Sequence, residues 1–89
     1  MPCPVIIIHP NDNVAVALRD LKSGEILVLP DGATLTTTMD IPFSHKVALS
    51  DLPTGATIIK YGENIGCAKT PIGQGEWIHT HNLSLEEVL

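Results

Sequence analysis

The chain of 89 residues carries ten acidic and five basic side chains, for a formal net charge of −5, and 44% of its residues are hydrophobic. This charge has the wrong sign for a domain that neutralises nucleic-acid phosphates, and the apolar run at residues 5–8 is too short to span a bilayer. No basic segment precedes that run, as a signal peptide would require, so we expect a cytoplasmic protein without nucleic-acid or membrane partners. Because a small aliphatic core stabilises a domain only modestly, we also expect a complex or a homo-oligomer.

An internal repeat is the most informative feature of the chain. Residues 16–24 (Val-Ala-Leu-Arg-Asp-Leu-Lys-Ser-Gly) are echoed by residues 47–55 (Val-Ala-Leu-Ser-Asp-Leu-Pro-Thr-Gly). A shorter form, an apolar residue three positions before Gly, recurs at 72–75, and residues 41–44 (Ile-Pro-Phe-Ser) are a weaker copy. Each copy predicts a turn that feeds a strand, because Gly adopts a positive φ at low cost and the following residues favour strands.

Short strands are predicted along almost the whole chain, with turn residues between them. In chain order the candidate strands are residues 4–9, 13–18, 25–29, 33–38, 46–49, 56–60, 64–69 and 76–81. One alternative is a helical turn over residues 14–22, where Ala17, Leu18 and Leu21 lie near one helical face.

The end of the chain carries the other helical signal. Ser84 and Glu87 have capping-box spacing, and the apolar residues around them predict a short C-terminal helical tail. We therefore expect one all-β domain over residues 1–89 that ends in this tail.

His79 and His81 are separated by one residue at the end of the last predicted strand. Side chains in a strand alternate between the two faces, so both imidazoles are expected on one face. Two such rings suit either a metal ion or acid–base contact with a substrate carboxylate or hydroxyl. The alternative is a pair of exposed histidines on an edge strand.

Two further pairs combine charge with a turn. His45 and Lys46 follow the turn at residues 40–44, and Lys60 and Tyr61 precede a glycine that permits close approach of the backbone. These side chains offer a cation, a titratable ring and a hydroxyl for an anionic ligand. The alternatives are a solvated loop pair for the first and, for the second, a strand-end charge beside a half-buried packing residue.

The remaining polar features have structural explanations. Asn11 and Asn13 lie in a turn in which such side chains bond to their own backbone, and His9 at its border is more typical of a structural histidine. Cys3 and Cys67 form no C-x-x-C pattern and are expected to be small buried side chains in a reducing compartment. No known nucleophile or phosphate-binding motif is present, so the residues alone leave catalysis undetermined.

Several segments taken together resemble the SAF-type domain of the altronate and galactarate dehydratase family. They are residues 8–16 (Ile-His-Pro-Asn-Asp-Asn-Val-Ala-Val), 40–42 (Asp-Ile-Pro), 45–49 (His-Lys-Val-Ala-Leu), 59–63 (Ile-Lys-Tyr-Gly-Glu), 65–66 (Ile-Gly) and 79–82 (His-Thr-His-Asn). The resemblance covers nearly the whole chain. It implies a β-clip fold, which agrees with the turn-and-strand units predicted above.

The resemblance also implies a function. Members dehydrate sugar acids to 2-keto-3-deoxy acids with a divalent metal, typically iron or manganese, that is associated with a large catalytic domain. The chain is then expected to be a separate small subunit, or the small domain of a fused enzyme, that completes the active site of this large partner and is inactive alone.

Carried over to matching positions, the resemblance gives His79, His81 and His45 acid–base roles, with His79 and His81 also near the metal. Lys46, Lys60, Tyr61, Asn11 and Asn13 become contacts of the sugar-acid substrate. The family pattern usually has Gly before His-Lys, where this chain has Ser44, which leaves the local turn open.

Two other functions remain possible from the sequence. One is the small (alpha) subunit of a sulfolactate sulfo-lyase, a relative that eliminates sulfite from a similar 2-hydroxy acid. The other is a binding or assembly module without catalytic residues, since SAF-like domains also occur in such proteins.

Overall fold

Between residues 3 and 85, the part that the computed structural model describes, the chain forms nine short antiparallel strands and no helix. The strands are β1 (Val5–Ile6), β2 (Val14–Ala17), β3 (Ile26–Val28), β4 (Thr34–Thr36), β5 (Lys46–Ala48), β6 (Thr57–Lys60), β7 (Glu63–Ala68), β8 (Trp77–Ile78) and β9 (Leu83–Ser84). The predicted all-β fold is therefore confirmed. Because these residues form no helix, they contain no apolar helix that could span a bilayer.

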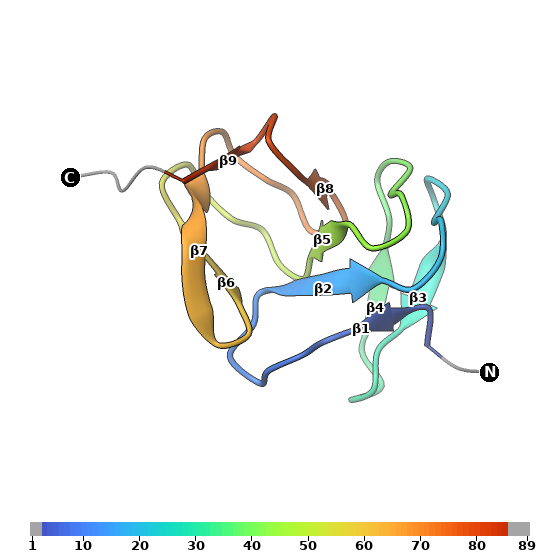
Figure 1. Cartoon of the computed structure of the whole chain (residues 1–89). Helices are drawn as coiled ribbons and strands as arrows, with labels where there is room; N and C mark the ends of the chain where they lie inside the picture. The colour runs from blue at the N-terminus through green and yellow to red at the C-terminus, as the bar shows by residue number, and fades with distance from the viewer. Residues whose placement is uncertain (1–2, 86–89) are drawn as a thin grey trace.

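A central sheet of order β1-β2-β5-β8 lies between two smaller units (Figure 1). The β3–β4 ribbon lies on one side of it, and the sheet of order β6-β7-β9 lies on the other (Figure 1). The principal extents of 43 × 24 × 19 Å describe an elongated molecule, as expected for a β-clip domain.

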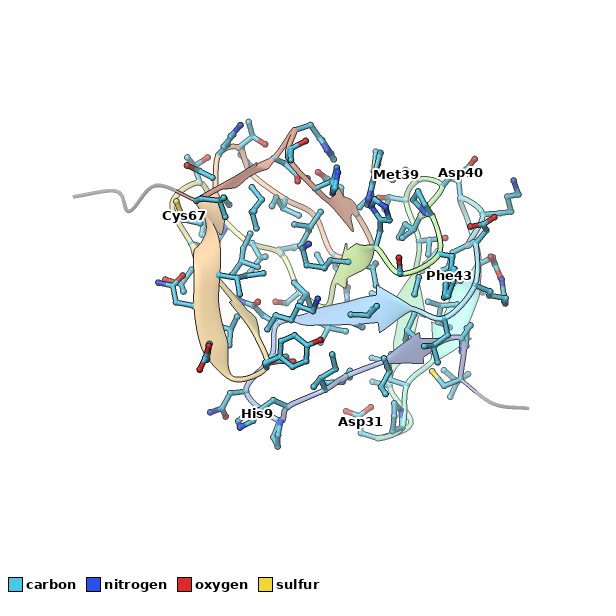
Figure 2. All side chains as sticks on the ribbon, in the orientation of Figure 1. His9, Asp31, Met39, Asp40, Phe43 and Cys67 are labelled. Carbon is cyan, nitrogen blue, oxygen red and sulfur yellow. The ribbon has the colours of Figure 1, made fainter. Side chains whose placement is uncertain are left out.

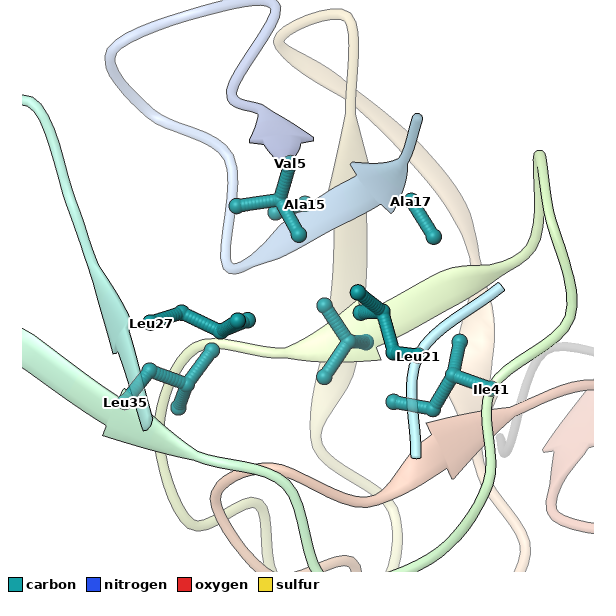
Figure 3. Packing of buried hydrophobic residues seen from close by; sticks show 8 residues of the cluster. Val5, Ala15, Ala17, Leu21, Leu27, Leu35 and Ile41 are labelled. Atoms are coloured by element: carbon teal, nitrogen blue, oxygen red, sulfur yellow. The ribbon is translucent and has the colours of Figure 1, made fainter. Parts of the chain in front are cut away.

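Each flanking unit covers one apolar cluster, and each cluster takes buried side chains from the central sheet. In the first cluster, Leu27 and Leu35 of the β3–β4 ribbon join Ala15 and Val47. Both leucines point toward the middle of this cluster (Figure 3). The second cluster joins Val14, Ala48 and Ile78 to residues under the β6–β7 ribbon. Successive side chains of β5 point to opposite faces of the sheet, so Val47 belongs to the first cluster and Ala48 to the second. The middle of the domain is thus a fixed platform for residues at the strand ends.

The internal repeat corresponds to four copies of one turn. Gly24, Gly55 and Gly75 occupy the same position of three copies, with φ of 84°, 86° and 86°. The fourth copy has Ser44 at this position, also with a positive φ of 69°. Each turn is closed by a hydrogen bond from the following backbone N–H to the carbonyl three residues earlier. The predicted repeat is confirmed, and the serine does not change the turn.

The first residues of these turns join the copies in pairs. Leu21 bridges Ile41, and Leu52 bridges Ile72, through reciprocal backbone hydrogen bonds of 2.7–2.9 Å. All four side chains are buried, so each turn begins at the core. The tips of the first three turns are exposed, whereas Gly75 of the fourth is buried.

Replacing Ser44 by glycine should stabilise the domain by about 0.5–1 kcal/mol. A side chain in the left-handed region costs about 1–2 kcal/mol, and glycine returns part of that gain because it loses more backbone entropy on folding. Urea denaturation of the variant measures the difference. The exchange Gly24→Ser in the equivalent turn is the matched control and should destabilise; a destabilising Ser44→Gly would show that φ does not limit this turn.

The two helical predictions are not confirmed by the described residues. The alternative helical turn over residues 14–22 is wrong, because Val14–Ala17 is strand β2, paired with β1 and β5 on either side. The helical tail is not formed at its predicted start, where Ser84 ends strand β9. Residues 86–89 of the tail lie outside the described residues. No disulfide joins Cys3 and Cys67. Cys67 is buried as expected, whereas Cys3 is only half-buried.

Candidate active site

His79 and His81 lie in the turn that follows β8. The buried Asn82 makes this turn, since its Oδ1 accepts the N–H of His79 at 2.9 Å and its Nδ2 donates to the carbonyl of Trp77 at 2.8 Å. These bonds take the place of ladder bonds, so the prediction that the strand continues beyond Ile78 is wrong. The two histidines are held by a side-chain cap and not by strand alternation.

The indole of Trp77 brings the two histidines of this turn together with a third. Its ring stacks on His79 with centroids 5.6 Å apart and an interplanar angle of 10°. It meets His81 at 5.0 Å and His45 at 5.6 Å in tilted contacts. His45 and His79 are themselves 4.6 Å apart. We call these four rings the ring cluster, together with Lys46, whose charge acts on His79.

His45 reaches the ring cluster from the Ser44 turn. The turn ends with the His45 N–H bonded to the carbonyl of Pro42 at 3.1 Å, and the chain then enters β5 beside β8. The Nδ1 of His45 accepts a 3.1 Å hydrogen bond from the indole N–H of Trp77. The turn that ends at Ser44 therefore places the imidazole of His45 next to that of His79.

Lys46 extends the ring cluster toward the β6–β7 ribbon. Partial burial lowers the pKa of Lys46 from its ordinary value, and the positive charge of Lys60 lowers it further. Among residues 3–85 the one ion pair is Arg19–Glu25, so neither lysine is neutralised by a described carboxylate. An acidic domain thus concentrates unpaired positive charge at one place, which suits an anionic ligand.

The pKa of His79 lies below 6.5, its ordinary value. Burial is the largest cause, followed by electrostatic interaction with His45, Lys46 and His81. Its ring is therefore mostly neutral at pH 7 and able to accept a proton. A neutral imidazole beside fixed positive charge is an arrangement suited to taking a proton from a carbon next to a carboxylate.

Removing the Lys46 charge should raise the pKa of His79 toward 6.5. We expect Lys46→Met to shift the NMR titration of the His79 ring upward relative to wild type. Since the folded pKa is below the unfolded one, stability contributed by the neutral ring is lost as the pH falls below 6.5 toward the folded value. The loss of stability between these two pH values should be smaller in Lys46→Met. An unchanged His79 titration in the variant would contradict the electrostatic link.

Tyr61 sits at the tip of the β6–β7 hairpin in an unusual backbone conformation. Its φ is +58° and that of Gly62 is +73°, the signs expected of a type I′ turn. The buried Asp12 holds this turn by accepting the N–H groups of Tyr61 at 3.1 Å and Gly62 at 2.8 Å. Burial opposes the charge of Asp12, but these bonds and that from His9 outweigh it and lower its pKa. The Tyr61 ring is exposed, with the Lys60 Nζ 5.0 Å from its centroid.

Asn13 and Asn11 make their hydrogen bonds with residues outside the ring cluster. The Asn13 side chain accepts the N–H of Ile59 and donates to the carbonyl of Thr57, both at 2.8 Å, so its amide is occupied by strand β6. Asn11 is exposed and donates its backbone N–H to Nδ1 of His9 at 3.0 Å. A Cβ on Gly62, at the hairpin tip, would lie 3.0 Å from the His9 ring. In Figure 2, His9 lies at the lower edge of the molecule. The structure therefore joins His9 and Asn11 to the hairpin tip.

The ring cluster does not fit a resident metal centre by itself. No group of three or more histidine, cysteine, aspartate or glutamate side chains suited to holding a metal ion occurs among residues 3–85. His79 and His81 both rest against the indole, and they would need ligands from another chain or domain to complete a coordination shell.

Comparison with known proteins gives this cluster a context. The sequence matches the family described as the altronate/galactarate dehydratase SAF domain over residues 3–86. The chain belongs to this family. The resemblance predicted from the sequence is thereby confirmed.

Individual relatives of this SAF domain are of two kinds. Altronate dehydratase of Escherichia coli (strain K12) is 49% identical over 78 residues, which cover 86% of this chain and 15% of that protein. Galactarate dehydratase (L-threo-forming) of the same organism is 44% identical over 84 residues, 92% of this chain and 15% of that protein. The (2R)-sulfolactate sulfo-lyase subunit alpha of Chromohalobacter salexigens is 33% identical over 84 residues, 86% of this chain and 89% of that subunit. The chain thus spans about 15% of the length of the dehydratases but most of the length of the sulfo-lyase subunit.

Two members of this SAF-domain site were not among the residues predicted from the sequence. Trp77 contacts all three histidines, and Asn82 caps the turn that carries two of them. Trp77 is the single tryptophan of the chain and lies two positions before His79, which was an available signal. Asn82 directly follows the His-x-His pair, and asparagine is typical of such caps.

Proposed function

We propose that this SAF domain belongs to a sugar-acid dehydratase of the altronate or galactarate type and completes the active site of a much larger catalytic part. Support comes from its identity of 49% and 44% with the two dehydratases, of which it spans about 15%. The catalytic part is fused to the domain or separate from it. The domain is inactive alone, works in the cytoplasm, and receives its substrate when the two parts meet.

The observation that carries this proposal is the ring cluster with its unpaired lysine. Dehydration of a sugar acid needs a base for the proton next to the carboxylate, positive charge for the resulting enediolate, and an acid for the departing hydroxyl. In this proposal Lys46 binds the carboxylate and His79 takes the proton; the lowered pKa of His79 supports its role as the base. His81, on the same indole, is the candidate for delivering a proton to the leaving hydroxyl.

The hairpin tip supplies a second set of substrate contacts in this proposal. Lys60 lies close enough to Lys46 to lower its pKa, so the two ammonium groups act on one anion. The exposed Tyr61 offers its ring and hydroxyl beside Lys60. Sugar acids with several hydroxyl groups and one or two carboxylates match such a row of donors. Asn11 lies at the same tip, whereas Asn13 acts through the strand that it holds.

A divalent metal, Fe²⁺ or Mn²⁺, is held by the large catalytic part in this proposal. The described residues offer too few ligands for it, so no step here is assigned to metal bound by this domain. His79 and His81 remain candidates to approach such a metal at the junction of the two parts.

A second function, the alpha subunit of a sulfolactate sulfo-lyase, is favoured by one observation. The chain spans 89% of the length of that subunit at 33% identity. Both reactions are β-eliminations from a 2-hydroxy carboxylate, so the same lysine and histidines would serve either. The leaving group, sulfite or water, then depends on the catalytic part.

A substrate panel tests the proposal and separates these functions. The domain is purified together with its catalytic partner and supplied with altronate, galactarate and sulfolactate in the presence of Mn²⁺ or Fe²⁺. Formation of a 2-keto-3-deoxy acid that requires both parts supports the dehydratase. Sulfite release from sulfolactate would assign the second function, and full turnover without the domain would leave it an assembly module.

A further inference from the structure

Among residues 3–85, Trp77 is the one residue whose side chain donates a hydrogen bond to the imidazole of His45. Its Nε1–H donates to His45 Nδ1 at 3.1 Å, while its ring face stacks on His79. Trp77 is half-buried in β8, where its Cα pairs with that of Val47, and it packs against the first core cluster. Because its backbone and one edge are fixed by this packing, the direction of the N–H is fixed as well.

An indole differs from most other hydrogen-bonding partners of a histidine. It donates one proton and accepts none, so the nitrogen that faces it must keep its lone pair. In neutral His45 the ring proton is then on Nε2, and a doubly protonated ring would lose the bond altogether. A water molecule or hydroxyl in the same place would tolerate either tautomer, since both groups donate and accept.

His79, whose ring lies beside that of His45, has no such constraint. Neither ring nitrogen of His79 takes part in a hydrogen bond with a residue in the described range 3–85, although its backbone N–H is bound to Asn82. The two imidazoles are 4.6 Å apart and are therefore close in space but unequal in chemistry. One has a nitrogen occupied by a permanent donor, and the other has both nitrogens available.

We propose that Trp77 is a positioning residue that holds His45 in the neutral tautomer protonated on Nε2, so that His45 donates a hydrogen bond to the substrate and does not act as its base. This inference rests on the proposed function, because it divides the work within that site. His45 Nε2–H stabilises negative charge on the substrate carboxylate, and proton removal is left to His79. The role assigned to His45 from the sequence, acid–base catalysis, becomes hydrogen-bond donation.

The tautomer itself is measurable in the 89-residue chain without any catalytic partner. Long-range ¹H–¹⁵N correlation spectra of histidine-labelled protein distinguish a protonated ring nitrogen from one with a lone pair. In wild type at pH 7.5 we expect His45 to show a lone pair on Nδ1 and a proton on Nε2. Trp77→Phe keeps an aromatic ring against His79 but removes the N–H, and should move His45 to a mixture of both tautomers.

His9 is the matched internal control for this experiment. Its Nδ1 accepts the backbone N–H of Asn11, so it should show the Nε2-protonated tautomer in both proteins. An Nδ1-protonated His45 in wild type would overturn the inference, even if Trp77→Phe failed to fold. So would a folded Trp77→Phe variant in which the tautomer of His45 is unchanged.

Turnover of the complete enzyme separates failure of this inference from failure of the proposed function. With both correct, Trp77→Phe lowers kcat/KM about tenfold, the effect of losing one oriented hydrogen bond. A tautomer that changes in Trp77→Phe while every variant of the ring cluster keeps full turnover would overturn the proposed function alone. A tautomer that does not change, with turnover lost in His79→Ala, would overturn the inference alone.

Discussion

Lys46→Met should lower kcat/KM of the complete enzyme about 100-fold. Methionine keeps the length and most of the apolar contact of this half-buried side chain but removes its charge. A charged hydrogen bond to a substrate carboxylate contributes about 1.5–3 kcal/mol, and a factor of ten in rate corresponds to about 1.4 kcal/mol. Steady-state kinetics with the preferred substrate measures the loss.

Lys22→Met is the control for this comparison. Lys22 lies at an exposed turn beside Glu25, and its charge is not among the causes that lower the pKa of Lys46 or His79. It should leave turnover at the wild-type level. Equal effects of the two variants would show that only the net charge of the domain matters, and a fully active Lys46→Met would exclude Lys46 from the site.

Gly75→Ala should destabilise the domain by about 3 kcal/mol, which is a large share of the total stability of a domain of this size. The φ of Gly75 is +86°, where an alanine side chain costs about 1–2 kcal/mol. A Cβ at this position would also collide with the backbone carbonyl of Thr36. Backbone atoms cannot turn aside as a side chain can, so the collision adds a cost of about 1–3 kcal/mol.

The equivalent exchange Gly24→Ala isolates the collision. Gly24 has nearly the same φ, +84°, but a Cβ there meets nothing within 4 Å. We expect this variant to lose only the conformational cost, about 1–2 kcal/mol. Urea denaturation of both variants gives the comparison. Equal losses would mean that Gly75 and Thr36 are less closely packed than the structure describes.

The fold was predictable because local and global signals agree in the repeated turn. A glycine, an apolar residue three positions earlier and a β-forming run afterwards are all visible in the sequence. In the structure the glycine has a positive φ and the apolar residue is buried. The same pattern extends to Ser44, where the residue type alone gives a weaker signal for positive φ. Pairing between the copies, such as Leu21 with Ile41, has no local signal, because it depends on where the chain returns.

Strand β9 shows why a short element can escape prediction. Leu83 and Ser84 pair with Ala68 and Cys67 of β7 for only two residues each. The capping-box spacing that begins at Ser84 favours a helix locally. Pairing with β7 satisfies the same backbone groups at this position, so tertiary contact overrides the local preference.

The titratable residues of the candidate site could be predicted from the sequence, but the residues that hold them in place could not. His45, His79 and His81 were recognised by chemical type and meet around one indole, and the charge of Lys46 acts on His79. The reason given for His79 and His81, alternation along a strand, was wrong. Their convergence depends on Asn82, whose role in a turn is visible only once its backbone partners are known.

Trp77 illustrates the same limit from another direction. A single tryptophan in a short apolar strand is expected to pack against the core, and the half-buried Trp77 does so. That its N–H points at His45 depends on the register of β8 against β5, which no local pattern encodes.

The most direct test of the central claim is turnover by the complete enzyme that carries His79→Ala and His81→Ala together. The account predicts that the altered domain still assembles with the catalytic part, as judged by size-exclusion chromatography, while formation of the 2-keto-3-deoxy acid falls at least about 100-fold. Undiminished turnover in this double variant, or full activity of the catalytic part alone, would contradict the claim that the domain completes the active site.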